Sequence, residues 1–460
     1  MTENFIAELN RRDTERIKSY QTLLNFYQGQ HWPDRPRWGE KRLTFNYARL
    51  FVDKITSYLM SGVSFAIDAA QDSDQARQQA QRAEAALLEV YQQNSLEQLD
   101  LETETDCAVM GDAAYKVIWD SAAKTVRVTA PDIQGIYAWW PGDDAAQVWR
   151  VASKYRLSPE ESERLYQRKP RGETATVIEV WTDASFELYL DGELLESRPN
   201  PYRCIPFVIY PNMREPKKLW GVSDLVPIME GQQELNRALS QLSRILELSG
   251  NPIAVLENVE GSQDIAVRPG AVWNLPEDSR AYLLDLLQGG GLNLHIDYIN
   301  LLYRSLHDLA ESPRAAFGGT ERDLSGVALE IELQPLLQKV SRKRIIRSAT
   351  YNRRNRLILD LLEKYRGEDF GPLRLRTVWC PVMPRDTARL VSSEQTLIQS
   401  GIHSRRRAMD ELGVADPELE FRRWLEERAQ ILKMNQEFNA RGPKTSRERG
   451  TEGRADGSEE

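Results

Sequence analysis

Apolar side chains recur at helical spacing in two stretches near the middle of the chain. The first stretch, Val222–Leu248, predicts one helix that Ser223 or Asp224 can cap. Its apolar stripe follows a 4-3-4 spacing and consists of Leu235, Leu239, Leu242 and Leu246. The second helix begins near Asn293, stops at Pro313 and carries on one face Ile296, Ile299, Leu302 and Leu306. At roughly 1.5 Å per residue these helices are about 40 and 30 Å long.

Between the two helices lies an insert, residues 250–291, with a β pattern. PIAVLENV and AVWNL predict two strands joined through VRPG. The side of the first helix that faces away from the leucines is polar without interruption, and it consists of Gln233, Asn236, Arg237, Ser240, Gln241 and Arg244. Two long helices with a small β module at their far end indicate a stalk rather than the core of an enzyme.

The segment before the stalk mixes helices with strands. Apolar periodicity predicts helices at residues 4–30, Asn46–Ser61, Asp74–Asn94 and Leu96–Met110, and a short strand at Ser64–Ala69. In the second of these helices we expect Leu50, Ile55 and Leu59 to face inward. Residues 113–210 alternate polar and apolar positions, and Asp191-Gly192 predicts a type I′ hairpin. The tryptophans of this β-rich part favour a packed core over a surface that stacks bases.

A long basic helix follows the stalk over residues 326–365, and Pro335 should kink it. Eight cations lie within eighteen residues beyond the kink, with no acid among them: Lys339, Arg342, Lys343, Arg344, Arg347, Arg353, Arg354 and Arg356. Two interpretations stay open. The cations form either a surface for phosphates or an acidic partner, or a solvated face whose charges are answered by acids elsewhere in the chain.

The remaining segments complete an α+β chain. RLRTVWCPVM predicts a strand that returns to the β-rich part, and residues 387–429 predict three short helices. From residue 440 the composition is that of a disordered tail. The loop PRAAFGGTERDLS, residues 313–325, joins the second stalk helix to the basic helix, and its two glycines, two arginines and phenylalanine make it a candidate site as well as an ordinary turn.

Composition narrows the class of protein. The chain has 460 residues and a formal net charge of −9, which argues against binding nucleic acid over its whole surface. Its three cysteines are far apart, which indicates a reducing compartment and no disulfide framework. The polar start argues against a secretory signal, and no apolar run is long enough to span a bilayer.

No pattern in the sequence supports catalysis. The four histidines do not approach a metal-binding spacing, and neither a nucleophile elbow nor a phosphate-binding glycine loop occurs. We therefore expect no catalytic residue, no metal site and no cofactor.

The order of segments resembles a known family. FYQGQHW, then GDAAYKVIWD leading into strands, then GVSDLVPIMEGQQELNRALSQL, a β insert and LSGVALEIELQPLLQK follow one another as in portal proteins of tailed bacteriophages, of the type found in phages of Gram-positive hosts. The resemblance covers about residues 15–435. It implies a ring of about twelve subunits at one capsid vertex, through which double-stranded DNA is packaged and ejected.

The resemblance also implies a division of the chain. It assigns 1–220 to a wing, 221–249 to stem helix 1, 250–291 to a clip, 292–312 to stem helix 2, 313–325 to a tunnel loop, 326–386 to a long kinked helix and a return strand of the wing, 387–439 to a helical crown and 440–460 to a disordered tail.

Site residues follow from this division as expectations. The tunnel-loop residues expected to face DNA are Arg314, Phe317, Gly318, Gly319, Thr320 and Arg322; Arg237 and Arg244 are expected to face the lumen of the stem; and the cations expected to face a neighbouring subunit or phosphates are Arg342, Lys343, Arg344 and Arg347. Arg314 and Arg322 are the expected phosphate contacts, and Phe317 is a steric element.

The implied partners are other copies of the chain, DNA in transit, the large terminase subunit, head-completion or adaptor proteins, and the major capsid and scaffolding proteins, with no membrane. Such a protein is assembled in the host cytoplasm and resides in the virion. The rival hypotheses are a metal-dependent enzyme that processes nucleic acid and a monomeric adaptor with a cationic helix.

Overall fold

The computed structural model describes residues 8–9, 11–36, 38, 40–142, 144, 147–170, 172–216, 218–250, 253–257, 278, 280–284, 291–318, 326–382, 387–414 and 417–440. The chain divides into two compact units, Met1–Val382 and Met383–Glu460.

The first unit opens with helices that confirm the apolar periodicity. They are α2 (Thr14–Tyr27), α3 (Tyr47–Leu59), α4 (Asp74–Gln93) and α5 (Leu96–Met110), with strand β1 (Val63–Ala69) after α3. The Asn46 side chain caps α3 by accepting a hydrogen bond from the backbone nitrogen of Arg49, at 3.0 Å. Ile55 and Leu59 are buried as expected, but the prediction for Leu50 is wrong, since 46% of it is exposed.

Two antiparallel sheets form the β-rich part. The smaller has the order β3-β2-β9 and the larger the order β4-β5-β6-β7-β8. Their strands are β2 (Asp112–Asp120), β3 (Thr125–Thr129), β4 (Ile136–Trp139), β5 (Arg150–Leu157), β6 (Ala175–Thr182), β7 (Ser185–Leu190), β8 (Glu193–Pro199) and β9 (Phe207–Pro211). The predicted hairpin joins β7 to β8, and Asp191 and Gly192 both have positive φ, 46° and 90°, as a type I′ turn requires.

Most tryptophans of this part contribute to packing. Trp139 and Trp181 are buried, whereas Trp149 is 50% exposed. A short helix that the alternation did not predict, α6 (Pro159–Tyr166), lies between β5 and β6, and a capping box of Ser158 and Glu161 starts it. The 3-10 turn η1 (Ile133–Gly135) precedes β4.

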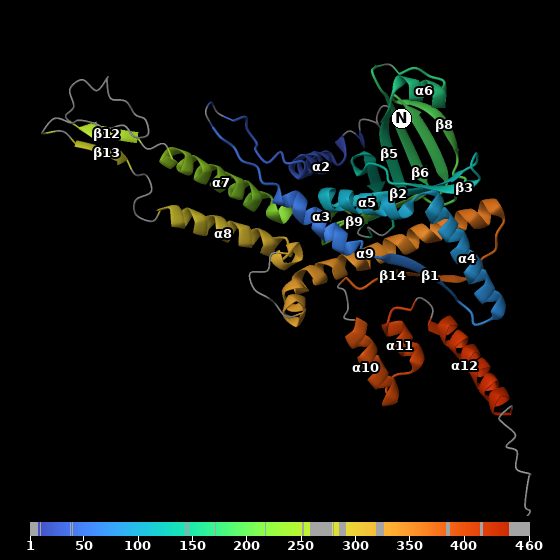
Figure 1. Cartoon of the computed structure of the whole chain (residues 1–460). Coiled ribbons are helices and arrows are strands. Elements are labelled where there is room, and N and C mark those ends of the chain that lie inside the picture. The colour runs from blue at the N-terminus through green and yellow to red at the C-terminus, as the bar shows by residue number, and fades with distance from the viewer. Residues whose placement is uncertain are drawn as a thin grey trace, which may run out of the picture. The chain divides into compact units, whose positions relative to one another are not determined.

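The first stalk helix begins later than its periodicity predicted. A short pair of strands, β10 (Met213–Arg214) and β11 (Gly221–Val222), and a 3-10 turn, η2 (Val226–Ile228), precede α7 (Met229–Gly250). The Ser223 hydroxyl accepts a hydrogen bond from the backbone nitrogen of Leu225, so it caps the turn before the helix. The second stalk helix, α8 (Gly291–Leu309), packs beside α7 (Figure 1).

The insert contains the antiparallel pair β12 (Ile253–Glu257) and β13 (Arg280–Leu284). The strand predicted at AVWNL, residues 271–275, lies outside the described residues, and the partner that β12 has in the structure was not predicted.

The long basic helix is α9 (Gly326–Arg366), which continues through Pro335 and bends in its N-terminal part (Figure 1). The strand after it, β14 (Leu373–Trp379), pairs with β1 and returns the chain to its first third. The second unit contains α10 (Thr387–Gln399), α11 (Arg405–Glu411) and α12 (Pro417–Ala440). Three helices are confirmed there, but α12 has 24 residues and is neither short nor complete by residue 429. The predicted tail lies outside the described residues.

The first unit contains two large apolar clusters, besides a smaller one in which Leu9 packs on the five-stranded sheet. One large cluster joins α2, α3, the five-stranded sheet, the N-terminal part of α7 and the C-terminal part of α8. The other large cluster joins α4, α5, the three-stranded sheet and α9. The stalk helices and the long basic helix, which the sequence singled out as functional, are therefore anchored in these two large clusters.

Candidate functional site

The polar face of α7 is partly a packing surface. Asn236 and Ser240, two residues of the polar face predicted on this helix, are buried, and so is Gln232 beside them. The Asn236 amide oxygen accepts from the backbone nitrogen of Phe45 at 3.0 Å, and its amide nitrogen lies 2.8 Å from Nδ1 of His31. Burial lowers the pKa of His31 and keeps its ring neutral. These side chains fix the strand-like segment before α3 to the stalk.

Replacing Asn236 with alanine should lower the free energy of unfolding by about 1–3 kcal/mol, because buried partners on His31 and Phe45 lose their hydrogen bonds. The matched control on the same helix is Arg237→Ala. Arg237 is exposed and pairs with Glu234 at 2.7 Å, so its loss should cost less than about 0.5 kcal/mol. Denaturant unfolding measures both, and equal losses would contradict a packing role for Asn236.

Arg237 and Arg244, the two cations predicted to face the lumen of the stem, are both exposed on α7. The face predicted to be apolar on α8 is only partly covered. Leu306 is buried, Ile299 and Leu302 are half-buried, and Ile296 is 41% exposed. A further set of large apolar side chains on α8 is exposed, and it consists of Leu294, Tyr298, Leu301 and Leu309.

The loop after α8 starts from a packed base. A 3-10 turn, η4 (Arg314–Phe317), follows Ser312, whose carbonyl accepts a hydrogen bond from Nδ1 of His307 at 2.6 Å. The Phe317 ring packs edge-on against Phe51 and His307, with ring centroids 5.7 and 5.5 Å away. Phe317, which we expected to act as a steric element, is half-buried at the anchored base of the loop.

Arg314 points outward from the same turn. Its side chain is exposed, and its guanidinium carbon lies 5.5 Å from the ring centroid of Tyr303. Gly318 has φ of 79°, a left-handed conformation that favours glycine where the turn ends. Gly319, Thr320 and Arg322, the other predicted loop residues, lie outside the described residues.

The basic run of α9 divides between two faces of the helix. Lys339, Lys343, Arg347 and Arg354 are buried, and Arg342, Arg353 and Arg356 are exposed. The expectation that Lys343 and Arg347 face a neighbouring subunit or phosphates is therefore wrong, because both are fully covered within their own chain. A sequence signal existed: the first three buried cations follow one another at intervals of four residues, beside the apolar Leu336 and Val340.

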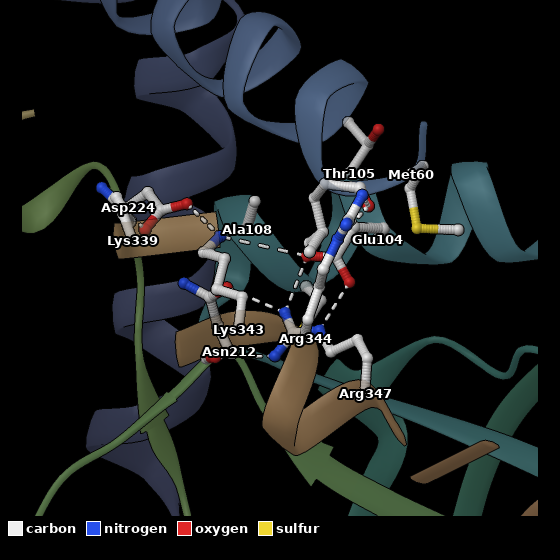
Figure 2. A network of polar contacts seen from close by, with 12 residues as sticks. Met60, Glu104, Thr105, Ala108, Asn212, Asp224, Lys339, Lys343, Arg344 and Arg347 are labelled. Carbon is white, nitrogen blue, oxygen red and sulfur yellow. Dashed lines mark hydrogen bonds and ion pairs between the residues drawn. The ribbon is translucent and has the colours of Figure 1, made fainter. Parts of the chain in front are cut away.

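The buried cations meet acids from distant segments (Figure 2). Arg347 binds both carboxylate oxygens of Glu104 at 2.7 Å, and Lys343 donates to Asp224 at 2.5 Å. Lys339 lies 3.3 Å from the other oxygen of Asp224. The network joins α5 and the turn before α7 to α9, so it fixes the start of the stalk against the long helix.

The pKa shifts of Asp224 and Arg347 show how their ion-pair partners offset the effect of burial. Burial by itself would raise the pKa of Asp224, but the ammonium groups of Lys343 and Lys339 outweigh it and hold that pKa below its usual range. Burial likewise acts to lower the pKa of Arg347, and the Glu104 carboxylate more than offsets this. Both shifts, the lowered pKa of Asp224 and the raised pKa of Arg347, favour the charged form, which is the behaviour of structural ion pairs rather than of proton donors.

A second buried group lies further along α9. The Arg354 guanidinium pairs with Asp100 and donates to the Tyr91 hydroxyl at 2.6 Å, and the Tyr115 hydroxyl donates to Asp100 at 2.8 Å.

Arg344 differs from the buried cations, since it donates to backbone carbonyls at the end of α3, Leu59 among them, and to the carbonyl of Cys380. Arg342 is exposed and pairs with Glu311 at 2.6 Å. Of the two interpretations left open, the one with acids from elsewhere in the chain holds for Lys343, Arg347 and Arg354, but its expectation of a solvated face is wrong for them, because these cations are buried.

Among the described residues, no cluster of His, Cys, Asp and Glu is suited to hold a metal ion. Within the same residues, no helix combines the length and the apolar character needed to cross a bilayer. The described geometry consists of a two-helix stalk, a loop anchored at its base, and a buried ion-pair network that ties the start of the stalk to α9.

Comparison with known proteins gives one family. The model described as phage portal protein, SPP1 Gp6-like, matches residues 6–434. A search of curated proteins finds no match. The matched range includes the stalk, the insert, the loop and α9. The chain therefore belongs to the SPP1 Gp6-like family of phage portal proteins, non-enzymatic, ring-forming proteins through which DNA is packaged into and ejected from the capsid at one vertex.

Proposed function

We propose that about twelve copies of this chain form the ring, with α7 and α8 as its stem, the segment between them as a clip, residues 313–325 as a tunnel loop, and the second unit as a crown. Residues 1–220, together with the strand after α9, form the wing. Such a ring occupies one vertex of the virion and is assembled in the host cytoplasm.

One observation carries this proposal: α8 exposes large apolar side chains along its length. Leu294 is 71% exposed and Leu301 60%, while the opposite side of the same helix packs on α7. Exposed apolar surface on a two-helix stalk is stabilised when copies of the stalk lie side by side. A closed ring supplies every stalk with two neighbours.

The loop supports a role in passing DNA. Phe317 holds its base in an aromatic cluster, and Arg314 extends outward from the same turn. One or two cations per subunit give a moving duplex weak contacts that break at every step, whereas a strongly basic lining would hold it. Arg314 and Arg322 are the proposed phosphate contacts.

The proposed position of each segment in the capsid determines its partners. The clip binds the large terminase subunit during packaging and head-completion or adaptor proteins afterwards. The wing and crown meet the major capsid and scaffolding proteins.

The mass of the purified particle tests the ring. A dodecamer of 52.8 kDa chains should weigh on the order of 0.6 MDa and show a central opening in electron micrographs. Leu301→Glu, which places a charge in the proposed contact between stalks, should shift the distribution toward single subunits. Asn293→Asp is the matched control, since it adds a negative charge at an exposed position near the start of the same helix. A protein that stays a single subunit at high concentration would end the proposal.

A further inference from the structure

The exposed side of α9 forms a continuous surface, here called the α9 outer face. It consists of Arg342, Ile345, Ala349, Arg353 and Arg356, which follow one another at spacings of three and four residues. Ile345 is 71% exposed. Arg342 and Arg356 pair with acids of their own chain, whereas no carboxylate in the described part of the chain pairs with Arg353. The surface is therefore apolar at its centre and cationic at its ends.

A groove of about 850 Å³ lies between β1, α4 and α5, here called the α4–α5 groove. Leu88 and Leu101 line it and are 58% and 47% exposed. Glu84 and Glu97, both exposed, stand on its rim. The groove is thus apolar inside and acidic at its edge, the complement of the α9 outer face.

The two surfaces lie on opposite sides of the first unit. Tyr91 and Asp100 line the groove, and their polar atoms bind Arg354 from the side of α9 that faces α4 and α5. Arg354 follows Ile345 by nine residues, about two and a half helical turns, so the two side chains leave α9 in opposite directions. The α9 outer face consequently points away from the groove of its own chain.

A ring requires this kind of arrangement. Neighbours in a cyclic ring meet head to tail, so each subunit presents two different surfaces that complement each other. We propose that the α9 outer face of one subunit docks on the α4–α5 groove of the next, with Ile345 against Leu88 and Leu101 and with Arg353 near Glu84 and Glu97. The inference rests on the proposed ring and names the wing surfaces that close it.

Cysteine cross-linking tests the contact directly. In a background that carries both Cys204→Ser and Cys380→Ser and keeps only the buried Cys107, the pair Leu101→Cys and Ile345→Cys is treated with a short bismaleimide. It should give a ladder of multiples of 52.8 kDa in the ring-sized fraction. Each variant with only one of the two introduced cysteines should give no ladder, because a head-to-tail contact never brings identical positions together. The matched control pair is Leu165→Cys with Ile345→Cys, since Leu165 is 62% exposed but lies on α6, away from the groove.

Charge reversal gives an independent readout. Arg353→Glu alone, and Glu84→Lys with Glu97→Lys, should each raise the protein concentration at which rings form by about fivefold. The chain that carries all three changes should return toward the wild-type value. Arg127→Glu, at an exposed position of β3, should have no effect.

The outcomes separate the two proposals. A wild-type chain that forms no ring overturns the proposed function. Rings that form normally, yet give no ladder with the Leu101 pair or give the same ladder with the Leu165 pair, overturn this contact alone. Charge-reversed variants that assemble at the wild-type concentration also overturn it.

Discussion

Replacing Arg347 with alanine is expected to lower the free energy of unfolding by about 3–5 kcal/mol, because it strands the Glu104 carboxylate in a fully buried position. The guanidinium also donates to the carbonyls of Pro211 and Asn212, so β9 loses its tie to α9 at the same time. Denaturant unfolding, followed by the fluorescence of the wing tryptophans, measures the loss.

Two controls distinguish the loss of the buried Arg347–Glu104 pair from the loss of any cation on α9. Arg342→Ala removes a cation five residues earlier on the same helix, where the pair with Glu311 is exposed, and should cost less than about 1 kcal/mol. Replacing Glu104 and Arg347 together by methionine should recover much of the loss, because neither member of the pair is left buried without the other and Lys343 keeps its ion pair with Asp224. An Arg347→Ala chain as stable as Arg342→Ala would contradict the structural role of the network.

Deleting Gly318–Arg322 should leave the ring intact and reduce the amount of DNA packaged per particle. The turn that precedes the deletion keeps its anchor, since Phe317 packs on Phe51 and His307 outside the deleted residues. The deletion removes Arg322, one of the two proposed phosphate contacts, and leaves the other, Arg314, in place. The measurement is the length of DNA recovered from particles assembled with the variant.

Point variants at Arg314 sharpen this test. Arg314→Ala should reduce packaging by less than the deletion, and Arg314→Lys should retain it if charge alone acts on phosphates. Ring mass is measured in parallel, because an assembly defect would also lower packaging. Normal DNA content in the deletion variant would remove the loop from the mechanism.

Local periodicity was sufficient to predict most helices of the chain. Leu96–Met110 has the predicted bounds, and Gly111 ends it with φ of 96°. The hairpin at Asp191-Gly192 was predictable because its turn needs two positive φ angles that few other residue pairs adopt. These features depend on neighbours within a few positions, which a sequence displays directly.

Contacts between distant segments were not predictable in the same way. Asn236 looked like part of a solvated face, but the segment that buries it lies 191 residues earlier in the chain. Lys343 and Arg347 looked like a surface for partners because their acids, Asp224 and Glu104, belong to other elements. Apolar periodicity reports which side of a helix is buried by apolar contacts, and it does not report burial achieved by ion pairs.

The pairing of β1 with β14 limits how early the first unit can complete its folding during synthesis. Residues 63–69 find their partner strand only in residues 373–379, and Glu104 finds Arg347 243 residues later. On the ribosome, the first helices must therefore wait, incompletely covered, until most of the polypeptide has emerged. A nascent chain halted before α9 would lack both Arg347 and β14, so it would expose an unpaired carboxylate at Glu104 and an open edge at β1. Host chaperones and proteases would act on such a chain before any ring could form.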